Sequence, residues 1–291
     1  MELVIVAPSA AGLGLDGSVL AGFGGVRVVE VGPIASIGEA HAAGIRAARA
    51  PLVALVEEHV CLEPAWAEAL VEAHRGPWDV VGPAVRNANP GSLISWADLL
   101  IAYSAWLDPS RAGPVRHLPG HNSCYKREVL LNYGDELGAR LDAETLLHWE
   151  LRQRGAGAYL EPRAVIRHLN FERVPAWART MFYAGRSFAA SRGRMWPVAR
   201  RALHAAGAPL IPLVRFVRVV GHLARRWPLA GLPVLCLPAV CFGLAVSAAG
   251  ECCGYALGAG DARRKLAIYE FHRRHHVRSL APSGSENHRD S

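Results

Sequence analysis

The sequence lacks the cysteine spacings of a disulfide framework or a zinc site, since it contains no Cys-x-x-Cys pair. It also lacks a secretory signal, because Met1-Glu2 leads directly into an apolar run. Most of the cysteines lie in the apolar C-terminal part, where we interpret them as small buried hydrophobic side chains in a reducing compartment. They are Cys61, Cys124, Cys236, Cys241, Cys252 and Cys253.

Acidic residues become scarce after residue 175. Residues 1–175 hold 15 Lys and Arg and 20 Asp and Glu, a net charge of 15 − 20 = −5, whereas residues 176–291 hold 17 and 5, a net charge of +12. The basic residues of the second part alternate with Leu, Val and Pro and match no helix-turn-helix or RNA-binding signature. We therefore expect an anionic membrane surface as a partner of this part, and not nucleic acid.

The stretch 38–59, GEAHAAGIRAARAPLVALVEEH, combines a helix pattern with a strand pattern. Residues 39–48 are Ala-rich and free of Pro, which predicts a helix, and Ala50-Pro51 ends it. The apolar run 52–56, bounded by Pro and by charges, is typical of a strand buried on both faces of a parallel sheet. The carboxyl end of such a strand is where open α/β sheets bind ligands. The residues at that end are Glu57, Glu58 and His59.

This unit resembles one in family 2 glycosyltransferases of the GT-A fold, where a Gly-containing helix precedes a strand that ends in Asp-x-Asp. Gly44 lies at the family's distance before Glu57. Glu57 and His59 stand in place of the two aspartates, and His41 with Ala42 in place of an Arg-Asn pair. The resemblance implies that Glu57 and His59 bind a metal ion, and that Glu57 and Glu58 lie beside the donor nucleotide.

A second segment, LPGHNSCYKREVL at 118–130, is similar to the family's Gly-x-Asn-x-x-aromatic-basic-basic-Glu pattern. In the family this segment leads from the acceptor site into a helix. The resemblance therefore implies that Gly120, His121 and Asn122 contact the substrate.

A third segment, LDAETLLHWELRQRG at 141–155, resembles the family's Glu-Asp segment, whose Asp is the catalytic base. Counting back from Gly155 aligns Glu144 with that Asp, and an alternative register aligns Asp142 with it. The basic last turn and Gly155 predict the end of a helix. We expect Glu144 to be the base and Trp149 to contact the substrate.

Residues 158–168 have the pattern of two short strands around a turn at Pro162. They end at His168, where the family often places a His that completes the metal site. The resemblance thus implies a metal site formed by Glu57, His59 and His168.

The N-terminal pattern predicts strands over 3–7 and 26–31. The Gly-rich stretch between them is too short and too poor in helix formers for the long first helix of the family. The family places a base-binding Asp after the second strand, and here Glu30 is the nearest acid. The resemblance places Pro8 and Glu30 at the nucleotide.

The middle of the chain predicts four further elements. Pro64 opens a helix that runs through Ala73, and a strand covers residues 78–81. A loop rich in Asn, Gly and Pro follows over 82–91, and a helix covers 92–107. An aromatic stripe on this helix is typical of core, with sugar stacking as the rarer alternative. The stripe consists of Trp96, Tyr103 and Trp106.

The C-terminal part is predicted to attach to a membrane. Residues 177–192 predict an amphipathic helix, and 202–223, with Arg215 and Arg218 on one face, favour a helix lying in the membrane interface. Residues 229–249 carry no charge over 21 positions, enough to span the hydrocarbon. Basic clusters on both sides of this run leave a single crossing and a re-entrant or monotopic hairpin both open.

Together these patterns predict an α/β protein with a GT-A-like, Rossmann-related mixed sheet flanked by helices, followed by C-terminal membrane-associated helices. We expect a catalytic domain at 1–195, a membrane-associated region at 196–275 and a disordered tail at 276–291. The resemblance implies an inverting transfer of sugar from a nucleotide-diphosphate sugar to a lipid-linked or glycan hydroxyl acceptor. It also implies a cell-membrane location with the catalytic domain on the cytoplasmic side.

Two imidazoles and a carboxylate form a softer ligand set than oxygen ligands alone, so the expected divalent cation is Mn²⁺ in preference to Mg²⁺. A degenerate, non-catalytic protein that binds a glycan, lipid or protein partner at the membrane is the alternative. A nucleotidyltransferase is disfavoured, because the Gly-containing stretch near the N-terminus has no Lys or Arg.

Overall fold

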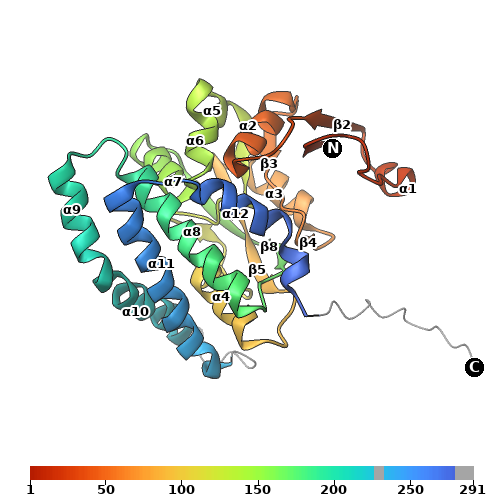
Figure 1. The fold of residues 1–291 in the computed structure, drawn as a ribbon. Helices are drawn as coiled ribbons and strands as arrows, with labels where there is room; N and C mark the ends of the chain where they lie inside the picture. Colours follow the sequence, from red (N-terminus) through yellow and green to blue (C-terminus); the bar gives the residue numbers. More distant parts are fainter. Residues whose placement is uncertain (226–232, 279–291) are drawn as a thin grey trace, which may run out of the picture.

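The structure, a computed structural model, describes residues 1–225 and 233–278 (Figure 1). It is a mixed α/β structure whose described strands lie within residues 2–168, with long helices along one side. The first two strands, β1 (Glu2–Ala7) and β2 (Gly25–Glu30), pair in parallel as a separate two-stranded sheet. Only the four-residue helix α1 (Gly17–Leu20) lies between them, as the Gly-rich stretch predicts.

The main sheet consists, in spatial order, of β3 (Leu52–Ala54), β7 (Cys124–Lys126), β5 (Val80–Asn87), β8 (Ala158–His168) and β4 (Val60–Leu62). The short strand β6 (Gly113–Pro114) also pairs with β8. Its edge strand β3 (Leu52–Ala54) pairs antiparallel with β7 (Cys124–Lys126). The expectation of a parallel strand buried on both faces was therefore wrong. Burial alternates along this segment, with Val53 and Leu55 buried and Ala54 and Val56 exposed, so only one of its faces is covered.

Two long strands form the centre of this sheet. The strand β5 (Val80–Asn87) extends through most of the segment that was predicted to be a loop, and it pairs in parallel with β8 (Ala158–His168). The prediction of two short strands around Pro162 was also wrong. The register between β5 and β8 shifts between Pro83 and Ala84, so Pro162 of β8 lies in a β-bulge. A bulge tolerates a residue that has no backbone N–H.

The helices that flank the sheet largely follow the predicted ranges. Ser36 caps α2 (Ile37–Ala47) by accepting from the Glu39 backbone N–H. Helix α3 (Trp66–Ala73) precedes β5, and α4 (Leu93–Tyr103) follows it, with Tyr103 and Trp106 in the core. Short helices α5 (Arg127–Leu131) and α6 (Leu137–Leu141) lead to α7 (Glu144–Gln153), after which Gly155 has a left-handed φ of 87°.

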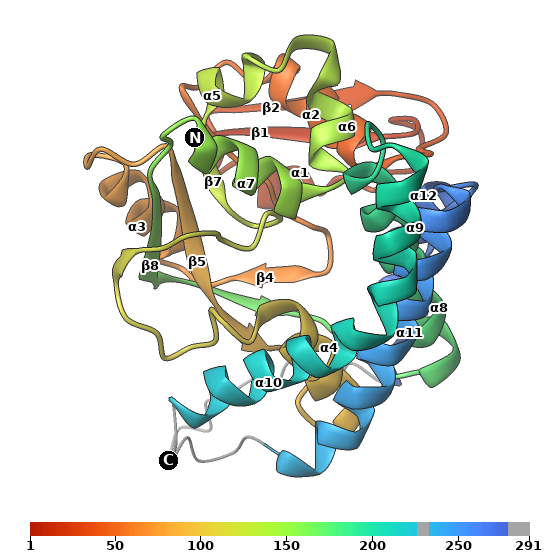
Figure 2. The same cartoon turned by 90° about the vertical axis from the view of Figure 1, so that its left-hand side faces the viewer.

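The C-terminal helices form layers on one side of this core (Figures 1 and 2). Helix α8 (Val174–Arg192) packs against α11 (Leu237–Leu257), while α9 (Val198–Gly207) and α10 (Ile211–Ala224) lie outside α11. Helix α12 (Ala262–Phe271) crosses back over α8. The short 3-10 turns are at 134–136, 208–210, 234–236 and 273–276, with strand β4 at Val60–Leu62.

Two helical segments, Val198–Ala224 and Val234–Leu257, are long and apolar enough to cross a membrane, which is weak evidence for membrane association. The second overlaps the apolar run 229–249 that the sequence suggested as a span, and residues 229–232 of that run lie outside the described part. It includes Glu251, which that run did not. Most of the tail predicted to be disordered, residues 279–291, also lies outside the described residues.

Candidate functional site

Glu57 lies in the loop after β3 and is held by Asn122, a residue from the second motif. The side-chain amide of Asn122 donates to Oε2 of Glu57 at 2.8 Å, and its oxygen accepts from the Glu57 backbone N–H at 3.3 Å. Asn122 is fully buried and has a left-handed φ of 69°. Because asparagine tolerates this backbone conformation better than most residues, it can turn the loop and bind Glu57 at once.

Two histidines converge on the same carboxylate. His59 Nε2 lies 3.6 Å and His168 Nε2 lies 3.8 Å from Oε2 of Glu57. One ligand atom from each of the three residues lies within 4.8 Å of the others, a spacing that could hold a metal ion. The structure thus brings together Glu57 and His59, from the loop between β3 and β4, and His168, from the end of β8. We call them the Glu57 cluster.

The outer ring nitrogens of these histidines already have partners. Nδ1 of His168 pairs with the side-chain oxygen of Asn170 at 2.8 Å, and Nδ1 of His59 lies 3.4 Å from Oε1 of Glu58. Both pairings place the proton on Nδ1 and leave Nε2 directed at Glu57 with a free lone pair. Metal-binding histidines are oriented in this way, by an oxygen on the ring nitrogen that faces away from the metal.

The cluster is almost closed to solvent. His59 and His168 are 3% and 2% exposed, and Nε2 of His59 makes no hydrogen bond within the described part of the chain. Burial opposes ionisation of Glu57, but nearby positive charge, that of His121 first, holds its pKa well below the ordinary value. Burial, and then the charge of Arg273, lower the pKa of His168. The cluster therefore combines a carboxylate with a neutral His168, the charge states in which both groups bind metals.

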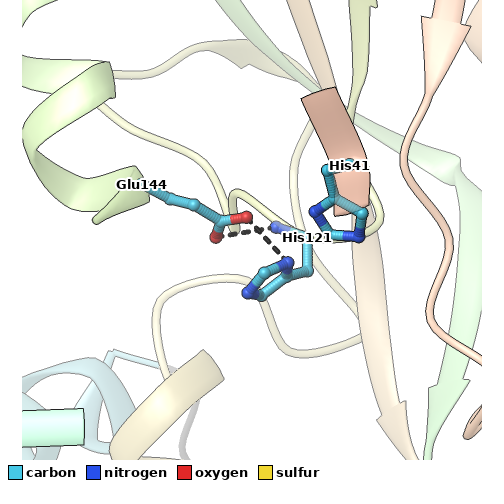
Figure 3. Close-up of side chains that lie close together, drawn as sticks. All are labelled: His41, His121 and Glu144. Atoms are coloured by element: carbon cyan, nitrogen blue, oxygen red, sulfur yellow. Dashed lines mark hydrogen bonds and ion pairs between the residues drawn. The ribbon is translucent and has the colours of Figure 1, made fainter. Parts of the chain in front are cut away.

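The second group lies next to the first and is drawn in Figure 3. Glu144, the first residue of α7, accepts from the backbone N–H of His121 at 2.9 Å, and its Oε1 lies 2.7 Å from Nδ1 of His121. His41 reaches this group from α2, with its ring 5.4 Å from that of His121. We call His41, His121 and Glu144 the Glu144 cluster. It too has a spacing that could hold a cation.

The loop 118–122 binds both carboxylates at consecutive residues, Glu144 at His121 and Glu57 at Asn122. Gly120 makes this possible, since a Cβ there would lie 2.0 Å from Oε2 of Glu144. The hydroxyl of Tyr125 fixes the loop, because it donates to the Gly120 carbonyl at 3.1 Å and pairs with Nε2 of His148 at 2.8 Å. The two acids predicted to act together therefore lie on either side of one short loop.

Charge differs sharply within the Glu144 cluster. Burial opposes protonation of His121, but the carboxylates of Glu144 and Glu57 raise its pKa to about 10. Burial, and then the charge of His121, lower the pKa of His41 to about 4. At neutral pH the cluster therefore holds an imidazolium beside Glu144 and a neutral imidazole next to it.

Asp142, the alternative base, has a different role in the structure. Its Oδ1 accepts from the hydroxyl of Ser36 at 2.8 Å and from the backbone N–H of Gly38 at 3.0 Å, so it supports the start of α2. A Cβ on Gly38 would clash with the backbone of Asp142. These contacts favour Glu144 over Asp142 as the residue available for proton transfer.

Several residues predicted for the site lie elsewhere. Trp149 packs on α8, with its ring 6.2 Å from that of Phe188 and the guanidinium of Arg192 5.4 Å above it. Glu30 is exposed and binds the loop after β1 through the hydroxyl of Ser9, so strand alternation does not direct it inward. Pro8 is exposed beside it. The side chain of Glu58 is half exposed and touches the Glu57 cluster only through His59.

The C-terminal segment contributes residues to the site that the sequence did not suggest. Arg273 is 7% exposed and donates to Oδ2 of Asp98 at 3.0 Å, and Asp98 also accepts from Trp177 Nε1 at 3.1 Å. Arg274 donates to the carbonyl of Glu58 at 3.1 Å. The segment 262–278 therefore packs against residues assigned above to the catalytic domain, although the predicted division assigns residues 262–275 to the membrane-associated region and 276–278 to the tail.

His41 was also not predicted as a site residue. The only signal for it was its position in the first motif, where a histidine replaces an expected arginine. For Arg273 no local pattern exists, because its contacts are made with residues far away in the sequence. A pocket opens beside His121, lined also by Asp142, Ser187 and Arg263, so the loop is accessible from the side of α8 and α12.

No protein-family model matches the chain, and no curated protein is significantly similar to it in sequence. The functional argument therefore depends on the geometry of the two clusters and on the motif resemblance.

Proposed function

We propose that this protein is an inverting, metal-dependent glycosyltransferase that moves a sugar from a nucleotide-diphosphate sugar to a hydroxyl acceptor. The observation that carries the proposal is the approach of Glu57 and Glu144 to consecutive residues of one loop. One carboxylate has the partners of a metal ligand, and the other lies beside a pocket mouth at His121.

The proposed reaction divides between the two clusters. Glu144 accepts the proton of the acceptor hydroxyl while the oxygen of that hydroxyl attacks the anomeric carbon. The bond between the anomeric carbon and the diphosphate oxygen breaks, and the nucleoside diphosphate leaves. Attack from the side opposite to the leaving group inverts the configuration. His121, charged at neutral pH, holds the carboxylate of Glu144 toward the acceptor.

Glu57, His59 and His168 fit a divalent cation, since three donor atoms converge and both imidazoles are oriented through Nδ1. A bound cation would neutralise charge on the departing diphosphate. The two nitrogen ligands favour Mn²⁺ over Mg²⁺, which prefers oxygen ligands. Arg274 donates to the carbonyl of Glu58 and adds positive charge there, whereas Asp98 and Glu270 balance the charge of Arg273.

We further propose that the protein acts at the cell membrane, with the clusters on the cytoplasmic side and a lipid-linked or envelope glycan as acceptor. The apolar helices that follow α8 support the location, and the acceptor class is inferred from it.

The proposal is tested with the purified full chain in detergent. Titration calorimetry with UDP- and GDP-sugars in Mn²⁺ is followed by a transfer assay with the sugars that bind. Binding and transfer, with transfer lost in Glu144→Gln, would support a transferase. Absence of binding to every donor would favour a non-catalytic protein that binds a glycan, lipid or protein partner.

A further inference from the structure

Helices α9 and α10 expose an apolar face, whereas a helix on the surface of a soluble protein exposes a polar one. On α10 two polar side chains face the protein: Arg215 pairs with Glu251 of α11 at 2.8 Å, and His222 bonds to Ser104 at 3.0 Å. The outer face is apolar and lies open. It consists of Leu210, Leu213, Val214 and Val217, which are 57–67% exposed and spaced by three or four residues.

Helix α9 repeats this arrangement. Arg201 turns inward and donates to the carbonyl of Tyr255 at 2.8 Å, near the end of α11. Val198 and Leu203 lie outward, 78% and 70% exposed. A soluble helix buries its apolar stripe, and an outward stripe on two consecutive helices requires a non-aqueous partner. We call this surface the outer face of α9 and α10.

Charge indicates the nature of that partner. No Asp or Glu occurs between Glu172 and Glu251, and the interval contains arginines but no lysine. Arg200 of α9 and Arg218 of α10 are exposed, as are Arg194 before α9 and Arg225 at the end of α10. An apolar stripe flanked by cations without any acid matches a bilayer whose headgroups are anionic.

The same helices are too short to cross that bilayer. Helix α10 has 14 residues, about 21 Å at 1.5 Å per residue, against a hydrocarbon core of about 30 Å. The segment Val198–Ala224 reaches spanning length only if it is straight, and Figure 2 shows α9 and α10 running in different directions on either side of the turn at 208–210. Each helix alone can therefore only lie along the interface.

Helix α11 is long enough to span but is packed against α8. Glycines allow this close approach: a Cβ on Gly250 would lie 2.1 Å from the carbonyl of Phe182, and one on Gly185 would lie 2.1 Å from that of Ser247. A crossing by α11 would carry α8 with it, although Arg179 of α8 bonds to Tyr269 of α12 and Trp177 bonds to Asp98 beside the site. Helix α11 is thus part of the protein core.

We propose that the outer face of α9 and α10 lies in the interface of an anionic bilayer, and that the chain attaches to one leaflet without crossing it. This goes beyond the proposed sugar transfer and does not depend on it. The apolar stripe would enter the boundary between headgroups and acyl chains, and the exposed arginines would bind lipid phosphates.

Flotation of the full chain with vesicles tests the docking face. We expect binding to be at least about tenfold tighter when roughly a third of the phosphatidylcholine is replaced by phosphatidylglycerol, and to weaken with salt. Val214→Asp with Val217→Asp should abolish binding. The control pair, Val19→Asp with Val71→Asp, changes two valines of similar exposure on α1 and α3 and should bind like wild type. Arg218→Gln with Arg225→Gln should reduce the preference for phosphatidylglycerol.

The single-leaflet attachment needs a second measurement. Leu235→Cys and Leu257→Cys lie at either end of the Val234–Leu257 segment and are both 74% exposed. In a background in which the native cysteines are replaced by Ala, a membrane-impermeant maleimide added outside intact vesicles should label both. Should the Cys-free background not fold, trypsin cleavage of the vesicle-bound native chain on both sides of α11 gives the same information.

Three results would overturn the proposal. One is unchanged vesicle binding by the Val214→Asp and Val217→Asp variant. Another is protection of one end of α11 from reagents outside the vesicle. The third is a wild-type dimer that the two aspartates convert to a monomer without loss of vesicle binding, which would mean that a second copy covers this face. Sugar transfer in detergent is measured separately, so its failure leaves this test unaffected.

Discussion

Oε1 of Glu144 lies 2.7 Å from Nδ1 of His121, yet the two atoms do not meet the angles of a hydrogen bond. The contact is an ion pair, and the second oxygen of Glu144 accepts a hydrogen bond from the backbone N–H of His121 (Figure 3). A carboxylate held in this way has a fixed position, and its Oε1 makes no hydrogen bond within the described residues. This arrangement leads to the first of five predictions.

Glu144→Gln keeps the shape of the side chain and removes the basic oxygen. We expect kcat to fall by about 10²–10⁴-fold, the range for loss of a general base, with donor affinity unchanged. Glu150→Gln on the same helix, which removes only ion pairs to Arg140 and Arg154, is the control. Loss of donor binding together with transfer would assign Glu144 a structural role.

His59→Ala should weaken Mn²⁺ binding, because it removes one of three converging ligands. Asn170→Ser, which alters the residue that orients His168, should cost about 10–100-fold in affinity. Mn²⁺ titration followed by electron paramagnetic resonance measures both, with His74→Ala as a histidine control outside the cluster. Full activity of His59→Ala in Mg²⁺ alone would contradict the assigned ligand set.

Gly120→Ala should displace the carboxylate of Glu144, since the new methyl group would lie 2.0 Å from it. We expect transfer to be lost and the free energy of unfolding to fall by about 1–3 kcal/mol, as for overpacked sites. Gly91→Ala adds a methyl group with no atom within 4 Å and provides the control. Equal activity of the two variants would mean that Glu144 does not need its observed position.

The free energy of unfolding should have two pH-dependent limbs from the Glu144 cluster. The pKa of His41 is lowered to about 4, first by burial, so the unfolded chain takes up this proton more readily and stability falls as pH drops from 6.5 toward 4. The pKa of His121 is raised to about 10 by Glu144 and Glu57 against the effect of burial. Its contribution is complete below 6.5 and is lost as pH rises toward 10.

Urea unfolding between pH 4 and 10 measures both limbs. His41→Gln should flatten the acid limb and leave the alkaline one, and His121→Gln should do the reverse. If both limbs persisted in both variants, other groups would be their source.

Glu251→Ala should destabilise the helical layer, because it leaves Arg215 without its carboxylate between α10 and α11. Removing one partner of a buried pair costs about 3–5 kcal/mol, and partial exposure of Arg215 places the expected value at or below the lower end. The double variant Glu251→Leu with Arg215→Met should recover most of this loss, as measured by thermal unfolding. A full loss in the double variant would show that packing, and not charge, joins these helices.

Local patterns were sufficient for part of the fold. The Ala-rich stretch before Pro51 forms α2, the Gly-rich stretch forms no long helix, and Gly155 follows the end of α7. These features depend on propensities within a few residues. The edge position of β3, the length of β5 and the bulge at Pro162 were predicted incorrectly, because they depend on which strand lies alongside.

The candidate site divides in the same way. The acids at 57 and 144, with His59, His121, Asn122 and His168, were recognisable from their order in three motifs, and the structure brings them together. Trp149 and Glu30 were also nominated, but they face other elements. His41 was missed although it stands in the first motif, and Arg273 was missed because nothing near it in the chain marks its role.

From residue types and spacing alone, the chain determines that it has an α/β part rich in acids, followed by a basic and apolar part. How that apolar part packs was decided only by the tertiary structure. The inward direction of Arg215 and the packing of α11 on α8 are contacts between segments far apart in sequence, and hydropathy along the chain contains no information about them. An apolar helix looks the same in sequence whether lipid or protein surrounds it, because both environments favour the same side chains.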